Sequence, residues 1–208
     1  MSEAAPKPRI LTLSDLIFGL ALSISALTLI GHQPTSATEL FASLGLYGFS
    51  FLIVISVWRL YSSITSILPS ETSWLMGLTY VMLFLVSIEP YLFNELFAVT
   101  TFGDVISDVY ACDLAIMFII LAAFNHALAN EERNLVAKSL LRHFRMSRNL
   151  CLVVAAIFLV STVPALGSTY LFSSYSGGAT IGLTIRSVLW IASLFVGWTR
   201  LFILRKAK

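Results

Sequence analysis

Six apolar runs, each about long enough to cross a bilayer, constrain this chain more than any other feature of its sequence. A hydrocarbon core of roughly 30 Å requires about 20 apolar residues per helical crossing. The runs cover residues 10–30, 38–62, 72–97, 105–129, 147–168 and 180–204. They are continuously apolar, whereas the strands of a transmembrane β-barrel alternate over about ten residues. The sequence therefore predicts an all-α membrane protein in which residues 1–208 form a single domain of six transmembrane helices.

The composition agrees with this fold class, because 58% of the residues are hydrophobic and only 12% are charged. The mean hydropathy of +0.89 is that of a chain dominated by membrane spans. Lys7 and Arg9 precede the first run as in a signal peptide, but a run of about twenty residues exceeds the length of a signal-peptide core. We therefore expect the first run to be a retained transmembrane helix.

The placement of basic residues predicts the orientation of the chain. Twelve of the thirteen Lys and Arg residues lie before the first run, at the end of the second, between the fourth and fifth, or at the C-terminal end. The three other loops carry none, and cytoplasmic loops are the ones enriched in Lys and Arg. Both termini are thus expected to be cytoplasmic. The remaining basic residue, Arg186, lies within the last run.

The loop between the fourth and fifth runs, residues 130–149, has an amphipathic pattern with basic residues between apolar ones. Its apolar residues, spaced as one helical face, are Leu135, Leu140, Leu141 and Phe144. The pattern predicts a helix lying along the inner membrane surface. A polybasic segment that binds lipid is the alternative.

Ionisable residues within the runs are candidate functional residues, because an uncompensated charge in hydrocarbon costs several kcal/mol. Glu89, Asp113 and Arg186 form either a salt-bridge network that holds the helices together or part of an ion vestibule or proton relay. Asp15 lies at the cytoplasmic end of the first run. It either caps that helix, because "TLSD" is close to a capping box, or contacts a neighbouring helix or subunit.

The first run also carries two stripes with helical spacing. Leu20, Ile24 and Leu27 form a bulky apolar stripe, which its chemistry alone would place in lipid or in the core. The adjoining stripe consists of the small residues Gly19, Ser23 and Ala26. Small residues allow helices to approach closely in membranes, so this second stripe is expected to pack against protein.

The sequence offers no support for catalysis or for a cofactor. Cys112 and Cys151 lie in predicted spans and read as packing residues, and the three histidines form no cluster with metal-ligand spacing. The sequence contains no nucleophile elbow, zinc-protease motif or phosphate-binding glycine loop. We therefore expect neither an enzyme nor a metal or cofactor site, and no nucleic-acid partner.

The stretch "RILTLSD", residues 9–15, resembles the Arg-x-x-x-Phe-Ser-Asp signature on the first helix of the transmembrane protein 175 family of potassium channels. Arg9, Ser14 and Asp15 match this signature, and Leu13 takes the place of the phenylalanine.

Two later stretches extend the resemblance. "YGFSFLIVISVW" looks like the second helix of the family, and Pro90 falls where the third helix often carries proline. Tyr61 stands three residues after Trp58, where the family often has histidine, and a tyrosine hydroxyl can also donate a hydrogen bond.

The resemblance also implies an oligomeric state. Residues 106–108, "ISD", repeat the end of the signature without an arginine at the corresponding distance, so we count one copy. Family members with two copies assemble as dimers, and single-copy prokaryotic relatives assemble as tetramers around a pore lined by the first helix. The resemblance thus implies a homotetrameric channel for K+ ions, a multi-pass protein of a prokaryotic plasma membrane.

Carried over residue by residue, the family's hydrophobic constriction falls on Leu20, with Ile24 and Leu27 as further rings and Ser23 as the residue that tunes selectivity. The resemblance gives Arg9, Leu13, Ser14 and Asp15 the role of a network that holds the pore helix in position.

Apolar rings of this kind would gate by dewetting and would favour K+ over Na+ modestly, because the sequence has no carbonyl filter. The main alternative is a proton-coupled or small-solute transporter that uses Asp15, Glu89 and Asp113 as a relay. A third hypothesis is a membrane scaffold without transport activity.

Overall fold

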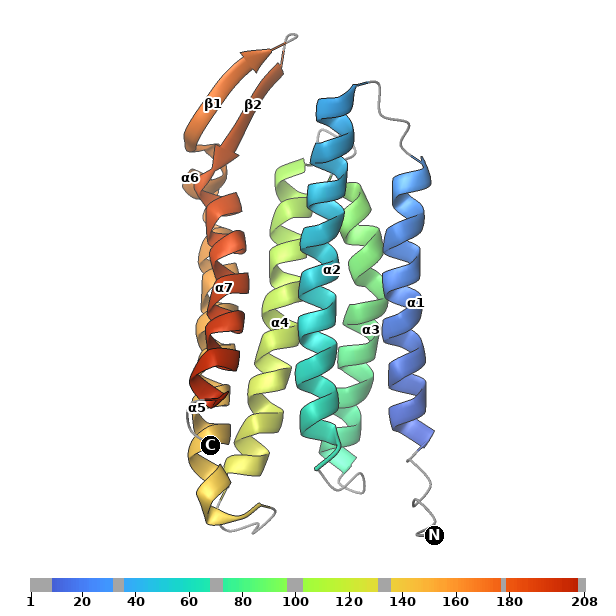
Figure 1. The fold of residues 1–208 in the computed structure, drawn as a ribbon, viewed down its shortest axis with the longest axis vertical. Coiled ribbons are helices and arrows are strands. Elements are labelled where there is room, and N and C mark those ends of the chain that lie inside the picture. The colour runs from blue at the N-terminus through green and yellow to red at the C-terminus, as the bar shows by residue number, and fades with distance from the viewer. Residues whose placement is uncertain are drawn as a thin grey trace. The chain divides into compact units, whose positions relative to one another are not determined.

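The computed structural model describes residues 9–31, 36–67, 73–96, 103–130, 136–176 and 179–205. The elements are α1 (Arg9–Gly31), α2 (Ala37–Thr65), α3 (Ser73–Glu95), α4 (Gly103–Ala129), α5 (Lys138–Ser161), α6 (Pro164–Ser168), β1 (Tyr170–Ser176), β2 (Ala179–Thr184) and α7 (Ile185–Arg205). The chain divides into two compact units, Met1–Tyr91 and Leu92–Lys208, and each is described by itself. Within each unit, successive long helices run in opposite directions (Figure 1).

Within the described ranges, five helices are long and apolar enough to cross a membrane. The spans are Ile10–Leu27, Ser43–Thr65, Ser73–Glu95, Asp104–Ala129 and Leu140–Ser161. The predicted class, a helical membrane protein, is thereby confirmed. The described apolar segment of α7, Ile185–Val196, is shorter, so the sixth crossing stays a prediction, as does the cytoplasmic location of the termini.

The fifth long helix differs from the expected range of 147–168. It begins at Lys138, so most of the segment expected to lie flat on the membrane surface forms the first turns of α5 instead. It ends at Ser161, because a proline at position 164 disfavours helical geometry at Val163, which is extended (φ −63°, ψ 121°). The short helix α6 then starts with this proline at its first turn. Leu135 lies outside the described residues.

Residues 170–184 form an antiparallel hairpin where the sequence predicted a loop and, from residue 180, a helix. Tyr170 pairs with Thr184 at the base of the hairpin, and Ser176 pairs with Ala179 at the far end (Figure 1). The prediction that the last helix begins at residue 180 is therefore wrong. Helix α7 begins at Ile185, where the Thr184 hydroxyl accepts a hydrogen bond from the backbone N–H of Ser187 at 3.2 Å and so caps the helix.

The core of the first unit includes the contact between α1 and α2. Phe18 and Ala21 of α1 are buried, and so are Val57, Tyr61 and Ile64 of α2. The rings of Phe18 and Tyr61 lie 5.7 Å apart. Burial of this apolar face fixes the rotation of α1 about its own axis.

In the second unit, α5 packs extensively against α4 and also packs against α7. Leu114, Leu121 and Leu128 are fully buried on α4, at the spacing of seven residues that keeps one face in register with a neighbouring helix. The rings of Phe118 on α4 and Phe158 on α5 stack at 6.1 Å. This unit therefore has its own apolar core.

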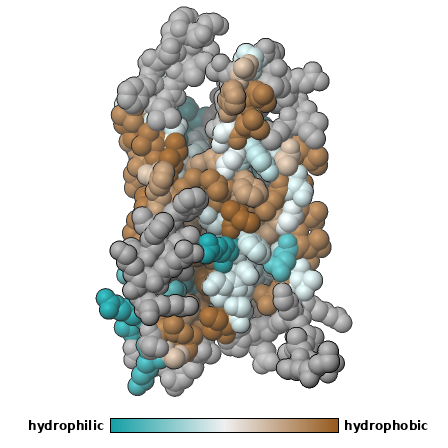
Figure 2. Space-filling model, in the orientation of Figure 1, coloured by the Kyte–Doolittle hydropathy of each residue, from teal (hydrophilic) through white to brown (hydrophobic). Residues whose placement is uncertain are grey.

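Much of the exposed surface of the spans is apolar, as the face in Figure 2 shows. Phe84 of α3 is 61% exposed, and Leu152 of α5 is 46% exposed. Large exposed apolar side chains on membrane-length helices are suited to contact with lipid or with another subunit.

Candidate functional site

Helix α1 presents a distinct buried face to α2. This face consists of Ser14, Phe18, Ala21 and Ser25, each at most 2% exposed. Their spacing of four, three and four residues places them on one side of a helix. Because this side is fixed by packing, the direction of every other side chain of α1 is fixed as well.

Ser14 and Tyr61 form a buried polar contact within that face. The Ser14 hydroxyl donates to the Ile10 carbonyl at 2.8 Å, and its oxygen lies 3.0 Å from the Tyr61 hydroxyl. Tyr61 is 2% exposed, so this contact is shielded from the surroundings. The structure thus brings Ser14 together with the tyrosine that stands three residues after Trp58.

Asp15 contacts α2 one position further along. The Trp58 Nε1–H donates a hydrogen bond to Asp15 Oδ1 at 3.0 Å. The capping interpretation of "TLSD" is wrong, because α1 begins at Arg9 and places Asp15 in the second turn. Leu13 is 44% exposed, and the side chain of Arg9 lies outside the described residues.

Trp58 was not among the predicted site residues, although the sequence contained a signal for it. Trp58 and Tyr61 are three residues apart on α2, and Ser14 and Asp15 are adjacent on α1. Residues three apart on a helix lie on neighbouring positions of one face, so both α2 side chains can reach the same turn of α1.

The predicted constriction residues lie together on an exposed face of α1. Leu20 is 52% exposed, Ile24 is 48% exposed and Leu27 is 60% exposed. Leu13 and Leu16 continue this stripe towards the start of the helix. Within its own unit, α1 therefore leaves a line of bulky apolar side chains uncovered.

Gly19 and Ser23 of the stripe of small residues are also exposed within this unit, and Ala26 is half-buried. A Cβ atom built on Gly19 would meet no atom within 4 Å, and Ser23 is exposed. The Ser23 hydroxyl donates to the Gly19 carbonyl at 2.8 Å. Since the hydroxyl hydrogen is used in this way, the Ser23 oxygen keeps its acceptor lone pairs for other groups. The expected packing of this stripe against protein would thus require a partner outside the unit.

Glu89 is the most deeply buried of the acidic residues whose side chains the structure describes in the first unit. It is 0% exposed on α3, and the Ser50 hydroxyl of α2 donates to Glu89 Oε1 at 2.7 Å. The α2 partners of Asp15 and Glu89, residues 58 and 50, are separated by about 12 Å along a helix axis. The structure therefore ties Asp15 and Glu89 to different levels of α2.

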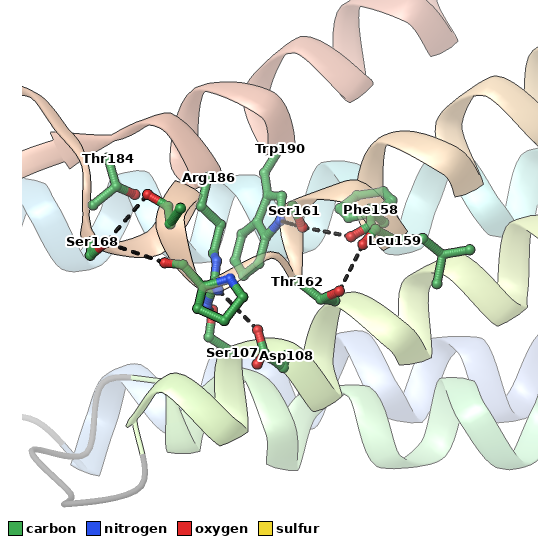
Figure 3. A network of polar contacts seen from close by, with 12 residues as sticks. Ser107, Asp108, Phe158, Leu159, Ser161, Thr162, Ser168, Thr184, Arg186 and Trp190 are labelled. Atoms are coloured by element: carbon green, nitrogen blue, oxygen red, sulfur yellow. Dashed lines mark hydrogen bonds and ion pairs between the residues drawn. The ribbon is translucent and has the colours of Figure 1, made fainter.

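Arg186 forms its described ion pair with Asp108, whereas the sequence grouped it with Glu89 and Asp113. Its guanidinium Nη2 lies 2.9 Å from Asp108 Oδ1, and Nη1 donates to the Ser107 hydroxyl at 2.7 Å (Figure 3). Ser107 and Asp108 belong to "ISD", the partial repeat of the signature. The repeat has no arginine of its own in the sequence, and Arg186 of α7 contacts it in the structure.

The α6 backbone approaches the same guanidinium closely. A Cβ atom added at Gly167 would lie 3.0 Å from Arg186 Cζ and Nη2. Nearby on α7, Trp190 Nε1–H donates to the Ser161 hydroxyl at 2.8 Å, at the end of α5 (Figure 3). These contacts fasten the start of α7 to α4, α5 and α6.

Among the residues that the structure describes, no group of three His, Cys, Asp or Glu side chains could hold a metal ion. The contacts of Ser14 and Asp15 with α2 are hydrogen bonds between helices, and their geometry suits the positioning of a helix.

The spans and the interhelical polar contacts define the class of this molecule, which is a multi-pass α-helical membrane protein. Residues 9–90 match the family model described as "Endosomal/lysosomal potassium channel TMEM175". This match includes the "RILTLSD" stretch and confirms the resemblance noted in the sequence. Over these residues the chain is similar to the TMEM175 family.

A solved structure extends the likeness over most of the chain. It is the crystal structure of a lysosomal potassium-selective channel TMEM175 homolog from Chamaesiphon minutus, with a TM-score of 0.59 and 16% sequence identity. The match covers 92% of this chain and 96% of that one. At this identity the match shows a shared fold. The comparison with curated proteins yields no match.

Proposed function

We propose that this protein is a modestly potassium-selective cation channel whose pore is lined by α1. The family model that matches residues 9–90 is that of a potassium channel, and the fold resembles that of a potassium-selective homolog. The observation that carries the proposal is the exposed stripe of Leu20, Ile24 and Leu27 on α1, a helix whose other face is buried against α2.

Symmetric association of subunits would place this stripe around a common axis. In a homotetramer with α1 at the centre, each of these residues would contribute four copies to an apolar ring. A narrow apolar ring is poorly hydrated, so an ion must shed water to pass it. K+ loses water more easily than Na+, and the sequence contains no TVGYG-like loop whose carbonyls would sharpen the discrimination.

Ser23 would tune cation preference beside these rings. Its oxygen retains acceptor capacity because the hydroxyl hydrogen is donated to the Gly19 carbonyl. An acceptor oxygen favours a cation over an anion. The polar group would therefore assist passage between two apolar constrictions.

Ser14 and Asp15 would position the pore helix and would not contact the ion. Their hydrogen bonds to Tyr61 and Trp58 hold α1 in the rotation that leaves Leu20 uncovered. Arg9 and Leu13 would complete this network from the start of the helix. In this assignment the charges of the signature serve assembly.

We further propose six membrane crossings with both termini in the cytoplasm of a prokaryotic cell and the protein in its plasma membrane. The alternating distribution of Lys and Arg supports this orientation. An even number of crossings places both termini on one side.

A proton-coupled or small-solute transporter is the second candidate. Full burial of Glu89 beside Pro90 in a membrane span favours it, because buried intramembrane acids often serve proton transfer. The separation of about 12 Å between the α2 partners of Asp15 and Glu89 disfavours a direct relay between these two acids.

Ion flux from purified protein in liposomes distinguishes these candidates. A channel will pass K+ faster than Na+, will exclude a large organic cation and will need no proton gradient. A transporter will require the gradient, and a scaffold will give no flux with any cation. The mass of the detergent-solubilised complex, measured in parallel, will be that of four subunits if the proposed assembly is right.

A further inference from the structure

The first two turns of α5 carry a line of exposed basic side chains. Lys138, Arg142 and Arg145 are exposed and are spaced by four and three residues, so they lie on one face of the helix. Leu141 and Phe144, on the adjoining side of the helix, are buried. The line extends for about 10 Å along the helix axis. We call these three residues the α5 basic face.

A fourth basic residue of the same helix is used within the protein. Arg148 Nη1 lies 3.2 Å from His126 Nδ1 on α4, and its Nε and Nη2 donate to Asn149 Oδ1 at 3.2 and 3.1 Å. Arg148 thus belongs to the contact between α4 and α5. Lys138 and Arg142 of the basic face form no such contact with described residues.

The sequence after the basic face carries no acidic residue. No Asp or Glu follows Glu132 in the sequence. Among the described residues, no carboxylate forms an ion pair with Lys138 or Arg142. Within the described part of the chain, these two exposed cations thus have no carboxylate partner.

The basic face coincides with the start of a membrane span. The apolar segment of α5 begins at Leu140, whose side chain is 46% exposed, and continues to Ser161. The polar layer of a bilayer leaflet is about 5–8 Å thick, comparable to the length of the basic face. Long basic side chains at this level extend to the headgroups while their methylene groups cover apolar surface.

We propose that the α5 basic face is a binding site for the phosphate-bearing headgroups of anionic lipids. Charge, exposure and position at the end of a membrane span together specify this ligand. Juxtamembrane Lys and Arg residues bind anionic headgroups with an energy that corresponds to about fivefold in affinity per charge. The proposal goes beyond ion conduction and requires only that α5 spans the membrane.

Lipid binding to the delipidated full-length protein, counted by native mass spectrometry, tests the proposal. Phosphatidylglycerol and phosphatidylcholine are titrated separately onto wild type, Lys138→Gln/Arg142→Gln and Arg148→Gln. We expect wild type to prefer phosphatidylglycerol and the double variant to bind it about 30-fold more weakly. Arg148→Gln, which removes a cation outside the basic face, should keep the preference of wild type.

Two further arms identify the source of the phosphate and guard against misfolding. Millimolar inorganic phosphate should fail to displace phosphatidylglycerol, because the lipid also contacts the apolar part of α5. The single variants Lys138→Gln and Arg142→Gln should each weaken binding about fivefold and can be measured if the double variant does not fold.

Equal binding of both lipids to wild type would overturn the proposal. Unchanged phosphatidylglycerol affinity in the single and double variants would also overturn it, as would full displacement by inorganic phosphate. Because no arm measures ion flux, these results are independent of whether the protein conducts.

Discussion

The indole of Trp58 donates a hydrogen bond to Asp15 at 3.0 Å, and one helical turn away on α2 the Tyr61 hydroxyl lies 3.0 Å from Ser14. Two adjacent residues of α1 are thus held by two residues on one face of α2. This double contact sets the rotation of α1 and so determines which of its side chains remain uncovered.

The bond between Trp58 and Asp15 should support assembly and leave ion preference unchanged. Trp58→Phe removes the donor and keeps an aromatic ring, and Asp15→Asn removes the charge. A hydrogen bond to a charged group contributes about 1.5–3 kcal/mol, less where solvent competes. We expect each variant to lower the melting temperature and the tetramer fraction, with little change in reversal potential. The double variant should lose little more than either single one, and additive losses would show that the two side chains act separately.

Tyr61→Phe should lower the free energy of unfolding by about 1 kcal/mol. The cost is modest because the Ser14 hydroxyl keeps its bond to the Ile10 carbonyl. Thermal unfolding in detergent measures this loss. Tyr80→Phe is the control, because Tyr80 is 54% exposed on α3, and it should behave as wild type. Equal stability of Tyr61→Phe and wild type would mean that the contact contributes nothing.

Breaking the ion pair between Arg186 and Asp108 should destabilise the second unit strongly. Asp108→Asn leaves the buried guanidinium without its carboxylate, and removing one partner of a buried pair costs about 3–5 kcal/mol. Asp108 is 37% exposed, so we expect the lower end of that range. Asp104→Asn, an exposed residue one turn earlier on α4, is the control. A loss no larger than that of the control would contradict the importance of this pair.

Gly167→Ala should be tolerated better when a smaller group replaces the Arg186 guanidinium. Gly167→Ala places a Cβ 3.0 Å from Arg186 Cζ and Nη2, so the arginine must shift away from Asp108. Because the guanidinium is the end of a flexible side chain, the cost should be about 1–2 kcal/mol. In an Arg186→Lys background, the same substitution should cost less. Equal costs in both backgrounds, measured by thermal unfolding, would place the strain elsewhere.

Periodicity predicted the membrane-length helices well because each span must satisfy its backbone within itself and present apolar side chains over its length. The hairpin at 170–184 was not predicted from the sequence, although Gly177 and Gly178 separate two short segments of strand composition. Residues 180–184 directly precede an apolar run, so the pattern of hydrophobic residues indicates a helix that begins at residue 180.

The residues that pair with the charged side chains could not be predicted from the sequence as well as the helices could. Arg186 reaches Ser107 over a separation of 79 residues, and no local spacing indicates which of several acids an intramembrane arginine will meet. Ser14 and Asp15 were found through a motif, but their bonds to Tyr61 and Trp58 depend on how two helices rotate against each other. Such contacts follow from packing and not from periodicity.

The central claim is that α1 lines the pore at Leu20, and one comparison of liposome flux tests it most directly. Leu20→Asn and Leu152→Asn make the same change at side chains that are 52% and 46% exposed on different helices. With equal protein incorporation, Leu20→Asn should raise cation flux and bring the reversal potentials for K+ and Na+ closer together, because a polar ring lowers the cost of dehydration. Leu152→Asn should conduct like wild type. If Leu20→Asn also conducts like wild type, with unchanged ion preference, Leu20 does not form the constriction and the claim is contradicted.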